Sequence, residues 1–391
     1  MSTSIRVSAL GAAIRRPGMI GAFALVLGFL LVSAHVALAG DLVVTHIAPY
    51  SGSMAAQARA YGAGARLYFD RVNAAGGIGG RRIALDARDD AGNPATTARQ
   101  ATAAMASRPL AFIGTIGQES ALGLLPMLKQ HQTALVGPLV DAVGVEATAG
   151  PFVFHMHPDV AQEVEGLAAS LHAFGLRKLV LCDPEDERYA TDTGRTFYRV
   201  AARDLVPVRC DTRSGSMDVV VRGIAALEPQ AVIFAGSTSA AAELIKALRA
   251  SGSYAMVVST SSVDPRELAT MLPRSAAIWL GAAQSIPNPR PVTPSQAEAI
   301  VREYSGALHA HDPVHPPPTR AGLAGYMAAK MVVEAIRRAG GAAEAPQVAR
   351  ALSTLHDHDL GGIRFDFSGT RAGGTTYTRV GIITATGAVL N

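Results

Sequence analysis

Three pairs of histidines and one acidic cluster have the spacing that metal binding or acid–base chemistry would need. The histidine pairs are His155/His157, His309/His311 and His356/His358. Residues two apart in an extended segment point to the same side, as metal ligands would. However, a structural metal site usually takes four ligands, and these pairs have only Asp312 or Asp357 nearby, so we expect no metal site.

Catalytic patterns are missing from the sequence. The acidic cluster Asp183–Glu187 contains a proline and follows a β-like run, which favours a solvated loop over paired carboxylates that do acid–base work. The chain has no G-x-S-x-G elbow, no H-E-x-x-H and no P-loop. We therefore expect a non-enzymatic protein without a cofactor.

Short apolar runs alternate with helical segments along most of the chain. Strands of this kind, separated by helices, are typical of parallel sheets that are covered on both faces. Two such series in tandem predict two doubly wound lobes. The predicted strands are Leu42–Ile47, Arg82–Ala87, Leu110–Ile113, Ala134–Val136, Lys178–Cys182, Val206–Cys210, Ala231–Phe234 and Ala255–Val258. The predicted helices are Met54–Ala74, Pro94–Ser107, Ser120–Gln130, Val160–Phe174, Arg188–Leu205, Asp218–Leu227, Ser239–Ser251, Ser295–Ala310, Arg320–Ala339 and Pro346–Leu355.

The C-terminal third departs from this alternation. Its helices suit a return to the first lobe, and they are followed by a final β pair, Gly362–Phe367 and Thr376–Thr384. A chain that crosses between lobes several times forms a hinge. We predict an α/β fold of two doubly wound parallel-sheet lobes joined by a multi-crossover hinge. Lobe 1 would comprise residues 40–157 and 284–358, and lobe 2 residues 158–283 and 359–391.

Residues 1–39 have the features of a secretory signal peptide. Three arginines (Arg6, Arg15 and Arg16) precede an apolar run, Met19–Val36, which ends in the cleavage pattern Ala37-Leu38-Ala39. An uncleaved membrane anchor is the alternative, but the run is short for a span of roughly 20 residues. No cysteine lies near the cleavage pattern to carry a lipid. We expect cleavage after Ala39 and a soluble protein in the periplasm.

The composition is that of a globular protein. Of 391 residues, 49% are hydrophobic and 17% are charged. The formal net charge of +4 falls to +1 without residues 1–39, which carry three arginines and no acidic residue. No cluster of basic residues with interleaved aromatics is present, so we expect no nucleic-acid partner.

Two cysteines each end a predicted strand of the second lobe. Cys182 and Cys210 lie at neighbouring strand ends if the segment between them is the helix of a βαβ unit. A disulfide is then geometrically feasible and would suit an oxidising compartment. Two small buried thiols are the alternative.

Ligands of open parallel α/β sheets bind outside the carboxyl ends of the strands. Helix N-termini present free N–H groups there, which favour anionic groups such as a carboxylate. The predicted loops at these ends are Tyr50–Ser53, Thr115–Ser120 and Pro138–Asp141 in the first lobe, and Asp183–Tyr189, Gly236–Thr238 and Ser259–Ser262 in the second.

One segment carries a recognisable signature. It consists of Ser51-Gly52, Gly64-Ala65, the run Val72–Gly80, Asp89-Asp90 and Asn93-Pro94. The glycines of the run end a helix and turn the chain, and Asp90 and Asn93 can cap the helix that begins at Pro94. The signature resembles the type I periplasmic binding proteins of branched-chain amino acid importers, the leucine/isoleucine/valine-binding family. The order of elements resembles that family over essentially the whole mature chain.

The resemblance implies a ligand carboxylate held by backbone N–H and hydroxyl groups of two loops in the first lobe. The implied residues are Gly117, Gln118, Glu119 and Ser120, then Leu139, Val140 and Asp141. Tyr189 matches an aromatic residue that closes over the ligand from the second lobe. The other loops at the cleft would add Ser51, Ser237, Thr238 and Ser261. Gln118, Ser120 and Asp141 have a simpler interpretation as helix caps, as has Asp264 before Pro265, and Tyr189 has one as ordinary surface packing.

Two departures from the family pattern concern the ligand. The stretch Ser259–Ser262 has no acidic residue where amino-acid binders of this family pair with the ligand ammonium group. The first carboxylate-binding loop has Gln118-Glu119 in place of a Ser/Thr run. Either Asp141, Glu119 or Asp264 supplies the counter-charge, or the ligand is a carboxylate, an amide or an aromatic acid without an ammonium group.

The resemblance implies a periplasmic substrate-binding component of an ABC importer, which traps a small polar ligand between its lobes and docks on a membrane permease. We expect a monomer. A receptor that reports its ligand to a membrane sensor is a second hypothesis. A periplasmic hydrolase on the same scaffold is a third.

Overall fold

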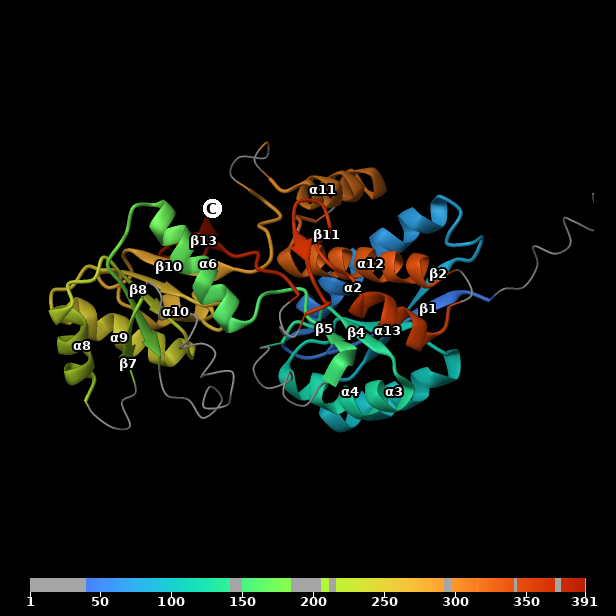
Figure 1. The fold of residues 1–391 in the computed structure, drawn as a ribbon, viewed down its shortest axis with the longest axis horizontal. Coiled ribbons are helices and arrows are strands. Elements are labelled where there is room, and N and C mark those ends of the chain that lie inside the picture. The colour runs from blue at the N-terminus through green and yellow to red at the C-terminus, as the bar shows by residue number, and fades with distance from the viewer. Residues whose placement is uncertain are drawn as a thin grey trace, which may run out of the picture. The chain divides into compact units, whose positions relative to one another are not determined.

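The computed structural model describes residues 40–140, 150–183, 205–210, 216–291, 295, 297–314, 316–340, 343–369 and 374–390. The predicted signal peptide and two predicted ligand residues, Asp141 and Tyr189, lie outside this part of the chain. The described residues form two lobes, each built on a largely parallel sheet (Figure 1). The α/β class and the two-lobed architecture predicted from the sequence are confirmed.

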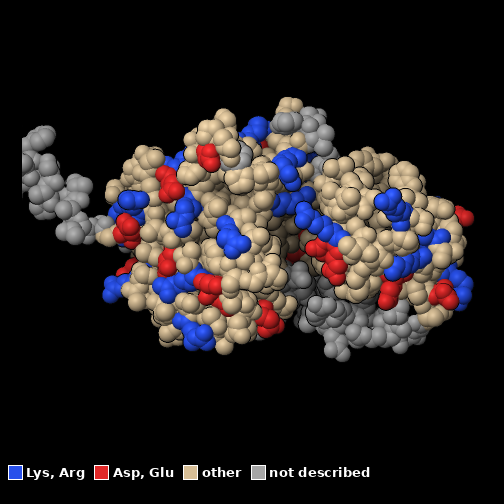
Figure 2. Space-filling model, turned by 180° about the vertical axis from the view of Figure 1, so that it is seen from behind, with Lys and Arg blue, Asp and Glu red and all other residues tan. Residues whose placement is uncertain are grey.

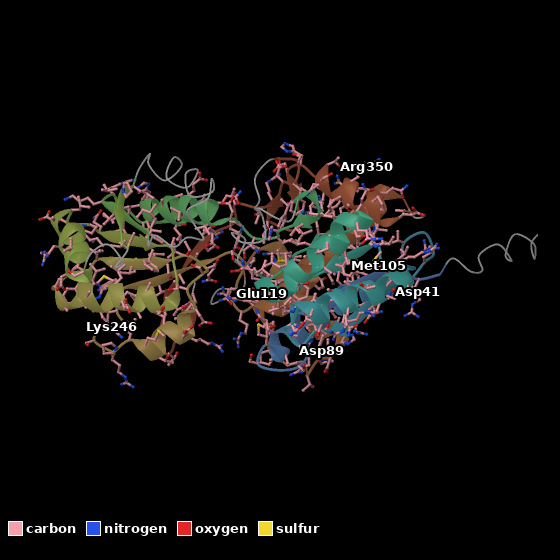
Figure 3. The ribbon with its side chains drawn as sticks, turned by 90° about the horizontal axis from the view of Figure 1, so that it is seen from below. Asp41, Asp89, Met105, Glu119, Lys246 and Arg350 are labelled. Carbon is pink, nitrogen blue, oxygen red and sulfur yellow. A yellow bond between two sulfur atoms is a disulfide. The ribbon has the colours of Figure 1, made fainter. Side chains whose placement is uncertain are left out.

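The first lobe is built on five parallel strands in the order β2-β1-β3-β4-β5. Its elements, in chain order, are β1 (Leu42–Ala48), α2 (Ala55–Ala74), β2 (Ile83–Asp89), α3 (Pro94–Ala104), the 3₁₀ turn Met105–Ser107, β3 (Ala111–Ile113), α4 (Gln118–His131), β4 (Ala134–Val136), the 3₁₀ turn Gly150–Phe152 and β5 (Val153–Phe154). Helices α3 and α4 cover one face of the sheet, where they share a core with Phe112 and Leu135 (Figure 3). The neighbouring strand residues, such as Ile113 and Val136, face the opposite core, as the two-residue period of a strand requires.

The second lobe is built on seven strands in the order β14-β13-β10-β9-β8-β6-β7. Its elements are α6 (Val160–Ala173), β6 (Leu179–Asp183), β7 (Val206–Arg209), α8 (Met217–Ala226), β8 (Ala231–Phe234), α9 (Thr238–Ala250), β9 (Met256–Ser259), α10 (Pro265–Met271), β10 (Leu280–Gln284), β13 (Arg379–Ile383) and β14 (Val389–Leu390). Strands β6 to β10 are parallel, whereas β13 and β14 add to the sheet in antiparallel fashion. The end of the chain therefore extends the sheet beyond β10.

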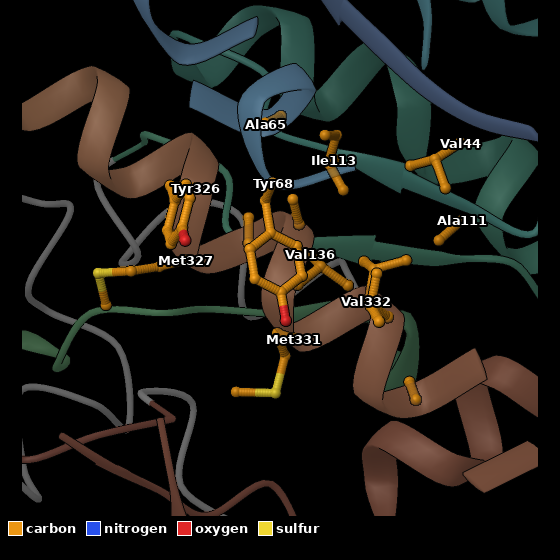
Figure 4. Close-up of a cluster of buried hydrophobic side chains, with 14 of the residues drawn as sticks. Val44, Ala65, Tyr68, Ala111, Ile113, Val136, Tyr326, Met327, Met331 and Val332 are labelled. Atoms are coloured by element: carbon orange, nitrogen blue, oxygen red, sulfur yellow. The ribbon is translucent and has the colours of Figure 1, made fainter. Parts of the chain in front are cut away.

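Three late helices return to the first lobe. They are α11 (Ala299–His311), α12 (Arg320–Ala339) and α13 (Ala345–Ser353), and a two-stranded ribbon of β11 (His358–Asp359) and β12 (Arg364–Phe365) follows them. Side chains of α12 such as Tyr326 and Val332 lie in one buried cluster with Tyr68 of α2 and Val44 of β1 (Figure 4). The chain passes from one lobe to the other after β5, after β10 and after β12. Phe365 of β12 belongs to the first core, and the predicted boundary between residues 358 and 359 stays a prediction.

Two details of the predicted C-terminal third are wrong. The stretches predicted as a final β pair do not pair with each other, because β12 pairs with β11 while β13 lies between β10 and β14. The predicted helix from Ser295 begins at Ala299. Strand β10 was missed because its sequence, LGAAQ, is small and weakly β-prone and shows no alternation of apolar and polar residues.

Of the two residues predicted to cap the helix from Pro94, Asn93 does so, whereas the Asp90 carboxylate accepts from the N–H of Gly92 and the hydroxyl of Thr97. The Asn93 side chain accepts hydrogen bonds from the N–H groups of Ala95 and Thr96 at the start of α3. The Asp264 side chain does the same for Arg266 and Glu267 at the start of α10. Both caps precede a proline in the first turn, where the missing N–H costs nothing.

Charged side chains of both signs are interspersed on the face of the molecule shown in Figure 2. Lys and Arg alternate there with Asp and Glu and with uncharged residues, without one continuous field of a single sign. Among the described residues, no helix is long and apolar enough to span a bilayer.

Helices α2 and α12 cross at very short range because glycines line their contact. A Cβ atom added at Gly64 would lie 1.8 Å from the carbonyl oxygen of Gly322, and one added at Gly325 would lie 2.0 Å from that of Tyr61. Any side chain at these positions must therefore push two backbones apart.

We expect Gly325→Ala to lower the free energy of unfolding by about 1–3 kcal/mol, because the added methyl overpacks the contact between α2 and α12. Gly306→Ala on α11 is the matched control, since a Cβ there meets nothing within 4 Å. The control should be neutral or stabilise the protein by up to about 1 kcal/mol through helix propensity. Urea denaturation of the two variants would contradict this account if Gly325→Ala were no less stable than the wild type.

Cys182 and Cys210 are joined by a disulfide with a Cα–Cα distance of 5.5 Å. The bond links the carboxyl ends of β6 and β7, which are neighbours at one side of the second sheet. It closes a loop with a sequence separation of 28 residues. The bridge therefore restricts the unfolded chain and ties the outer strand β7 to the sheet.

Replacing both cysteines by alanine should lower the stability of the second lobe by about 3.5 kcal/mol, the loop-closure entropy for a loop of this length. Urea denaturation of the Cys182→Ala/Cys210→Ala variant measures the loss. An unchanged midpoint would show that the bridge contributes nothing to stability.

Candidate functional site

The strand order of the first sheet determines where a ligand can bind. Strand β1 lies between β2 and β3, so the chain leaves β1 toward one side of the sheet and later returns on the other. A crevice forms at such a switch point, outside the carboxyl ends of the two strands. The residues that follow β1 and β3 there are 49–54 and 114–117, which include predicted ligand residues.

The loops after β3 and β4 are joined by backbone hydrogen bonds beyond the ends of their strands. The N–H of Leu139 donates to the carbonyl of Thr115 at 2.8 Å, and the N–H of Gly117 donates to the carbonyl of Leu139 at 3.2 Å. The structure thus brings together the two loops that were predicted to bind a carboxylate. The N–H of Gly117 serves this contact between the loops and is not available to a ligand.

Helix α4 begins directly at this junction. Gly117 is its N-cap residue, with φ of 90°, and supplies no side chain to the first turn. The N–H groups of Gln118, Glu119 and Ser120 precede the first intrahelical hydrogen bond, which Ala121 donates to the carbonyl of Gly117. No described residue accepts from these three N–H groups, and together they can bind an anion.

The side chains near this helix start have different surroundings. Ser120 is buried, Gln118 is half-buried and Glu119 is exposed on α4 (Figure 3). Leu139 and Val140 are half-buried and pack against hydrophobic clusters of the first lobe. We infer that this loop would contact a ligand through its backbone, because its apolar side chains are used in packing.

Ser51 is exposed on the loop after β1, and its N–H donates to the Asp89 carboxylate at 3.3 Å. Burial by itself would raise the pKa of Asp89, but hydrogen bonds from Ala91 and Ser51 outweigh this effect and hold the pKa below its ordinary value. Ser51 therefore also has a structural role, in which it links the loops after β1 and β2.

A buried polar layer supports the site from below. His46 on β1 has no exposed surface, and its Nδ1 lies 2.7 Å from the hydroxyl of Tyr50. The ring of Tyr61 from α2 lies 5.0 Å from the His46 ring, and its hydroxyl donates to the carbonyl of Gly137 at 2.9 Å. Burial lowers the pKa of His46 to about 3 and raises the pKa of Tyr50 to about 12. The layer is therefore uncharged at neutral pH and links the loops after β1 and β4.

Thr115 in the loop after β3 adopts a backbone conformation that is unusual for its type. Its φ is 98°, in the region that favours glycine, although threonine is β-branched. The buried side chain is held by a hydrogen bond from Oγ1 to the carbonyl of Ile47 at 3.2 Å. Such strained residues cluster at functional sites, where the surrounding structure imposes them.

In the second lobe, the three predicted serine and threonine residues make hydrogen bonds to other residues of the protein. The Ser237 side chain caps α9 by accepting from the N–H of Ala240, and Thr238 Oγ1 accepts from the N–H of Asp264 at 3.0 Å. The N–H of Ser261 donates to the carboxylate of Glu163 at 2.9 Å. These residues lie at the carboxyl edge of the second sheet, as predicted, and their observed contacts are structural.

Glu163 was not identified from the sequence. It lies in the first turn of α6, is only 2% exposed, and holds the loop after β9 through Ser261. The sequence of its helix does not indicate a functional residue, because Glu163 contacts a loop that is almost 100 residues away in the chain. It places a carboxylate beside the loop that lacks an acidic residue of its own.

Three cavities in the described part of the protein lie elsewhere. One of about 540 Å³ is lined by α2 and by the end of α11 with the segment after it, one of about 690 Å³ by α2 and α11, and one of about 590 Å³ by the segments around His356 and Thr375. None of the predicted ligand residues lines them.

The histidine pairs do not assemble into a metal site among the described residues. The rings of His155 and His157 lie 5.1 Å apart, and burial lowers the pKa of His155 to about 3. His356 pairs with Asp366 at 2.7 Å on the surface. His155 and His157 thus pack against each other, and His356 contacts a surface carboxylate.

Because His46 is buried, the stability of the protein is predicted to depend on pH. The unfolded chain takes up a proton on this histidine below its ordinary pKa of 6.5, whereas the folded protein keeps it neutral down to about 3. Since the unfolded state binds more protons in this window, stability falls as the pH falls from 6.5 toward 3. The contribution of His46 to this slope is about 1.4 kcal/mol per pH unit.

We expect His46→Asn to reduce that slope, because asparagine can still bond the Tyr50 hydroxyl but does not titrate. Urea denaturation at several pH values between neutral and acidic measures the difference between the variant and the wild type. The same slope in both proteins would show that the folded protein protonates His46 readily.

Comparison with known proteins identifies the architecture. The model of a family described as periplasmic binding protein matches residues 42–387. A substrate-binding periplasmic protein from Ralstonia solanacearum is 30% identical with a TM-score of 0.62, and 90% of this chain and 99% of that one are covered. An extracellular ligand-binding receptor from Verminephrobacter eiseniae is 25% identical with a TM-score of 0.66, and the coverage is 90% and 100%.

A third solved structure is that of a branched-chain amino acid transporter substrate-binding protein from Streptococcus pneumoniae in complex with isoleucine. It is 18% identical with a TM-score of 0.62, and 89% of this chain and 97% of that one are covered. At this identity the likeness concerns the fold alone. A comparison with curated proteins finds no match. Because the family model covers nearly all of the described chain, the protein belongs to the periplasmic binding protein family.

Proposed function

We propose that this protein is the substrate-binding component of an ABC importer and binds an amino acid or a related small carboxylate or amide. The observation that carries the proposal is the start of α4, where three consecutive N–H groups lack a described partner at the switch point of the first sheet. An anionic group is the ligand that such a helix start favours.

The second lobe supplies the other half of the proposed site. Glu163 lies beside the loop of Ser261, and its carboxylate is a candidate partner for a ligand ammonium group. This position would compensate for the loop 259–262, which has no acidic residue. Tyr189, outside the described residues, is the proposed aromatic residue that closes over the ligand.

The proposed mechanism is closure of the two lobes around the ligand. The first lobe holds the anionic end through backbone N–H groups that are already in place. A ligand that also contacts the second lobe binds the closed form more tightly and shifts the equilibrium toward it. A permease in the inner membrane would then recognise the closed form.

A thermal-shift screen tests the binding function directly. The ligands are amino acids, amides, dicarboxylates and aromatic acids, added to the protein without residues 1–39. A ligand at 100 times its Kd should stabilise the protein by about 2.7 kcal/mol, which raises its melting temperature by a few degrees. A hit that is not consumed over hours supports a binding protein, whereas turnover of the hit would indicate a hydrolase.

Two variants at one position test the role of the backbone. Gln118→Pro removes one N–H from the first turn of α4, where proline is tolerated. Loss of a hydrogen bond to a charged ligand group should weaken binding by about 10-fold or more. Gln118→Ala keeps the N–H and is the matched control, so its affinity should stay near that of the wild type. Equal affinities of the proline variant and the wild type would contradict the proposed site.

A further inference from the structure

Large apolar side chains are exposed along one edge of the second lobe. Among the described residues, eleven large hydrophobic side chains are exposed, and five of them precede strands of the second sheet. They are Phe174, Leu227, Tyr254, Ile278 and Trp279, which are 70%, 39%, 62%, 37% and 66% exposed. We call these five residues the amino-edge strip.

The sheet topology brings these residues side by side. Phe174 precedes β6, Leu227 precedes β8, Tyr254 precedes β9, and Ile278 and Trp279 precede β10. These strands are parallel and adjacent in the order β10-β9-β8-β6. The loops at their amino ends therefore lie next to each other, at the edge opposite the loops that were predicted to bind the ligand.

Hydrogen bonds hold the loops of the strip in place. The guanidinium of Arg249 lies 6.0 Å from the centre of the Tyr254 ring and donates to the carbonyls of Ser253 and Ile278, each at 2.9 Å. On the other side, Gln230 Oε1 accepts from the N–H groups of Arg177 and Lys178. The strip is thus presented by fixed loops, so its exposure is a property of the folded lobe.

Trp279 is the most informative member. It is the only tryptophan of the protein and has φ of 54°, a left-handed conformation that is rare for a bulky residue. Its carbonyl accepts from the N–H of Val257, which continues the pairing with β9. The residue is 66% exposed, although burial of a tryptophan is strongly favourable.

The charges around the strip indicate the chemistry of its partner. Among the described residues, Arg177, Lys178, Arg249 and Arg274 lie in or beside these loops, and Glu228 is the acidic residue within them. Lys178 contacts Glu228 at 3.6 Å, which leaves a surplus of positive charge. A second copy of the chain would bring like charges together, whereas an anionic surface would complement them.

We propose that the amino-edge strip docks the protein on the surface of a bilayer that contains anionic phospholipid. Tryptophan and tyrosine favour the interface between water and lipid, and basic side chains are attracted to anionic headgroups. None of the five residues lines any of the three cavities. The strip therefore suits a deformable surface such as a bilayer better than a small molecule that needs a pocket. Docking through this edge would leave the opposite edge free for ligand. The proposal does not depend on the identity of that ligand.

The single tryptophan allows a direct test, since tryptophan emission then reports on this one position. The protein without residues 1–39 is used, because the hydrophobic cores of the described residues lie between Leu42 and Val389. Vesicles of equal parts phosphatidylglycerol and phosphatidylcholine should shift the emission to shorter wavelength and sediment with the protein. Vesicles of phosphatidylcholine alone should do neither, and high salt should reverse binding to the anionic vesicles.

Charge-neutralising variants provide the controls. Arg177→Gln/Lys178→Gln should weaken partition into the anionic vesicles by about 30-fold, since each basic residue near such a surface contributes about 1 kcal/mol. Arg99→Gln/Arg350→Gln removes the same charge from exposed positions of the first lobe and should leave partition unchanged. Tyr254→Ser removes an aromatic side chain from the strip. Sedimentation of this variant with the anionic vesicles tests the contribution of apolar contact to binding.

Three results would overturn the proposal. The first is absence of binding to the anionic vesicles, which would favour a protein partner for the strip. The second is an equal loss in the control variant, which would mean attraction to the whole molecule. The third is an emission shift that depends on protein concentration without vesicles, which would indicate a second copy of the chain.

Discussion

Two backbone hydrogen bonds between the loops after β3 and β4 hold the candidate site in shape. The bonds between Leu139 and Thr115 and between Gly117 and Leu139 extend the pairing of two strands past their carboxyl ends. They place the first turn of α4 at the switch point, with its N–H groups free of described partners. The unusual φ of Thr115 belongs to the same arrangement, because this residue lies between strand β3 and the start of the helix.

The rest of the first lobe supports this junction. Its underside is the uncharged layer of His46, Tyr50 and Tyr61, which bonds the loops after β1 and β4. Tyr61 in turn belongs to α2, and α2 is fixed by its close contact with α12. Helix α12, which comes late in the chain, thereby supports loops that lie much earlier in the sequence.

The second lobe has two edges with different character. At the carboxyl edge, Ser237, Thr238 and Ser261 are engaged in caps and loop contacts, and Glu163 adds a buried carboxylate. At the amino edge, the same sheet exposes aromatic and aliphatic side chains among basic ones. Because the strands are parallel, solute binding and surface docking would be assigned to opposite ends of one sheet.

The alternation of strands and helices could be predicted from the sequence because each element is short, apolar or capped in a regular way. Asn93-Pro94 and Asp264-Pro265 marked helix starts that the structure confirms. The pairing of β13 with β10 could not be predicted, since nothing local to Arg379–Ile383 specifies a partner almost 100 residues earlier.

The candidate site was predictable only in part. The strand-end rule identified the loops around Gly117 and Leu139, but it could not show that the N–H of Gly117 is used between them. The structural roles of Ser237 and Thr238 depend on neighbouring loops in the same way. Burial of Glu163 also arises from tertiary contacts, so an exposed glutamate and a buried one look the same in the sequence.

The central claim is that backbone N–H groups at the start of α4 bind the anionic group of the ligand. The most direct measurement is an amide NMR spectrum of the ¹⁵N-labelled protein before and after addition of a ligand found by thermal shift. The account predicts large changes for the amide resonances of Gln118, Glu119 and Ser120, with the amide of Gly117 staying in its contact with Leu139. Saturating ligand that leaves these three amides unchanged would contradict it and place the binding site elsewhere.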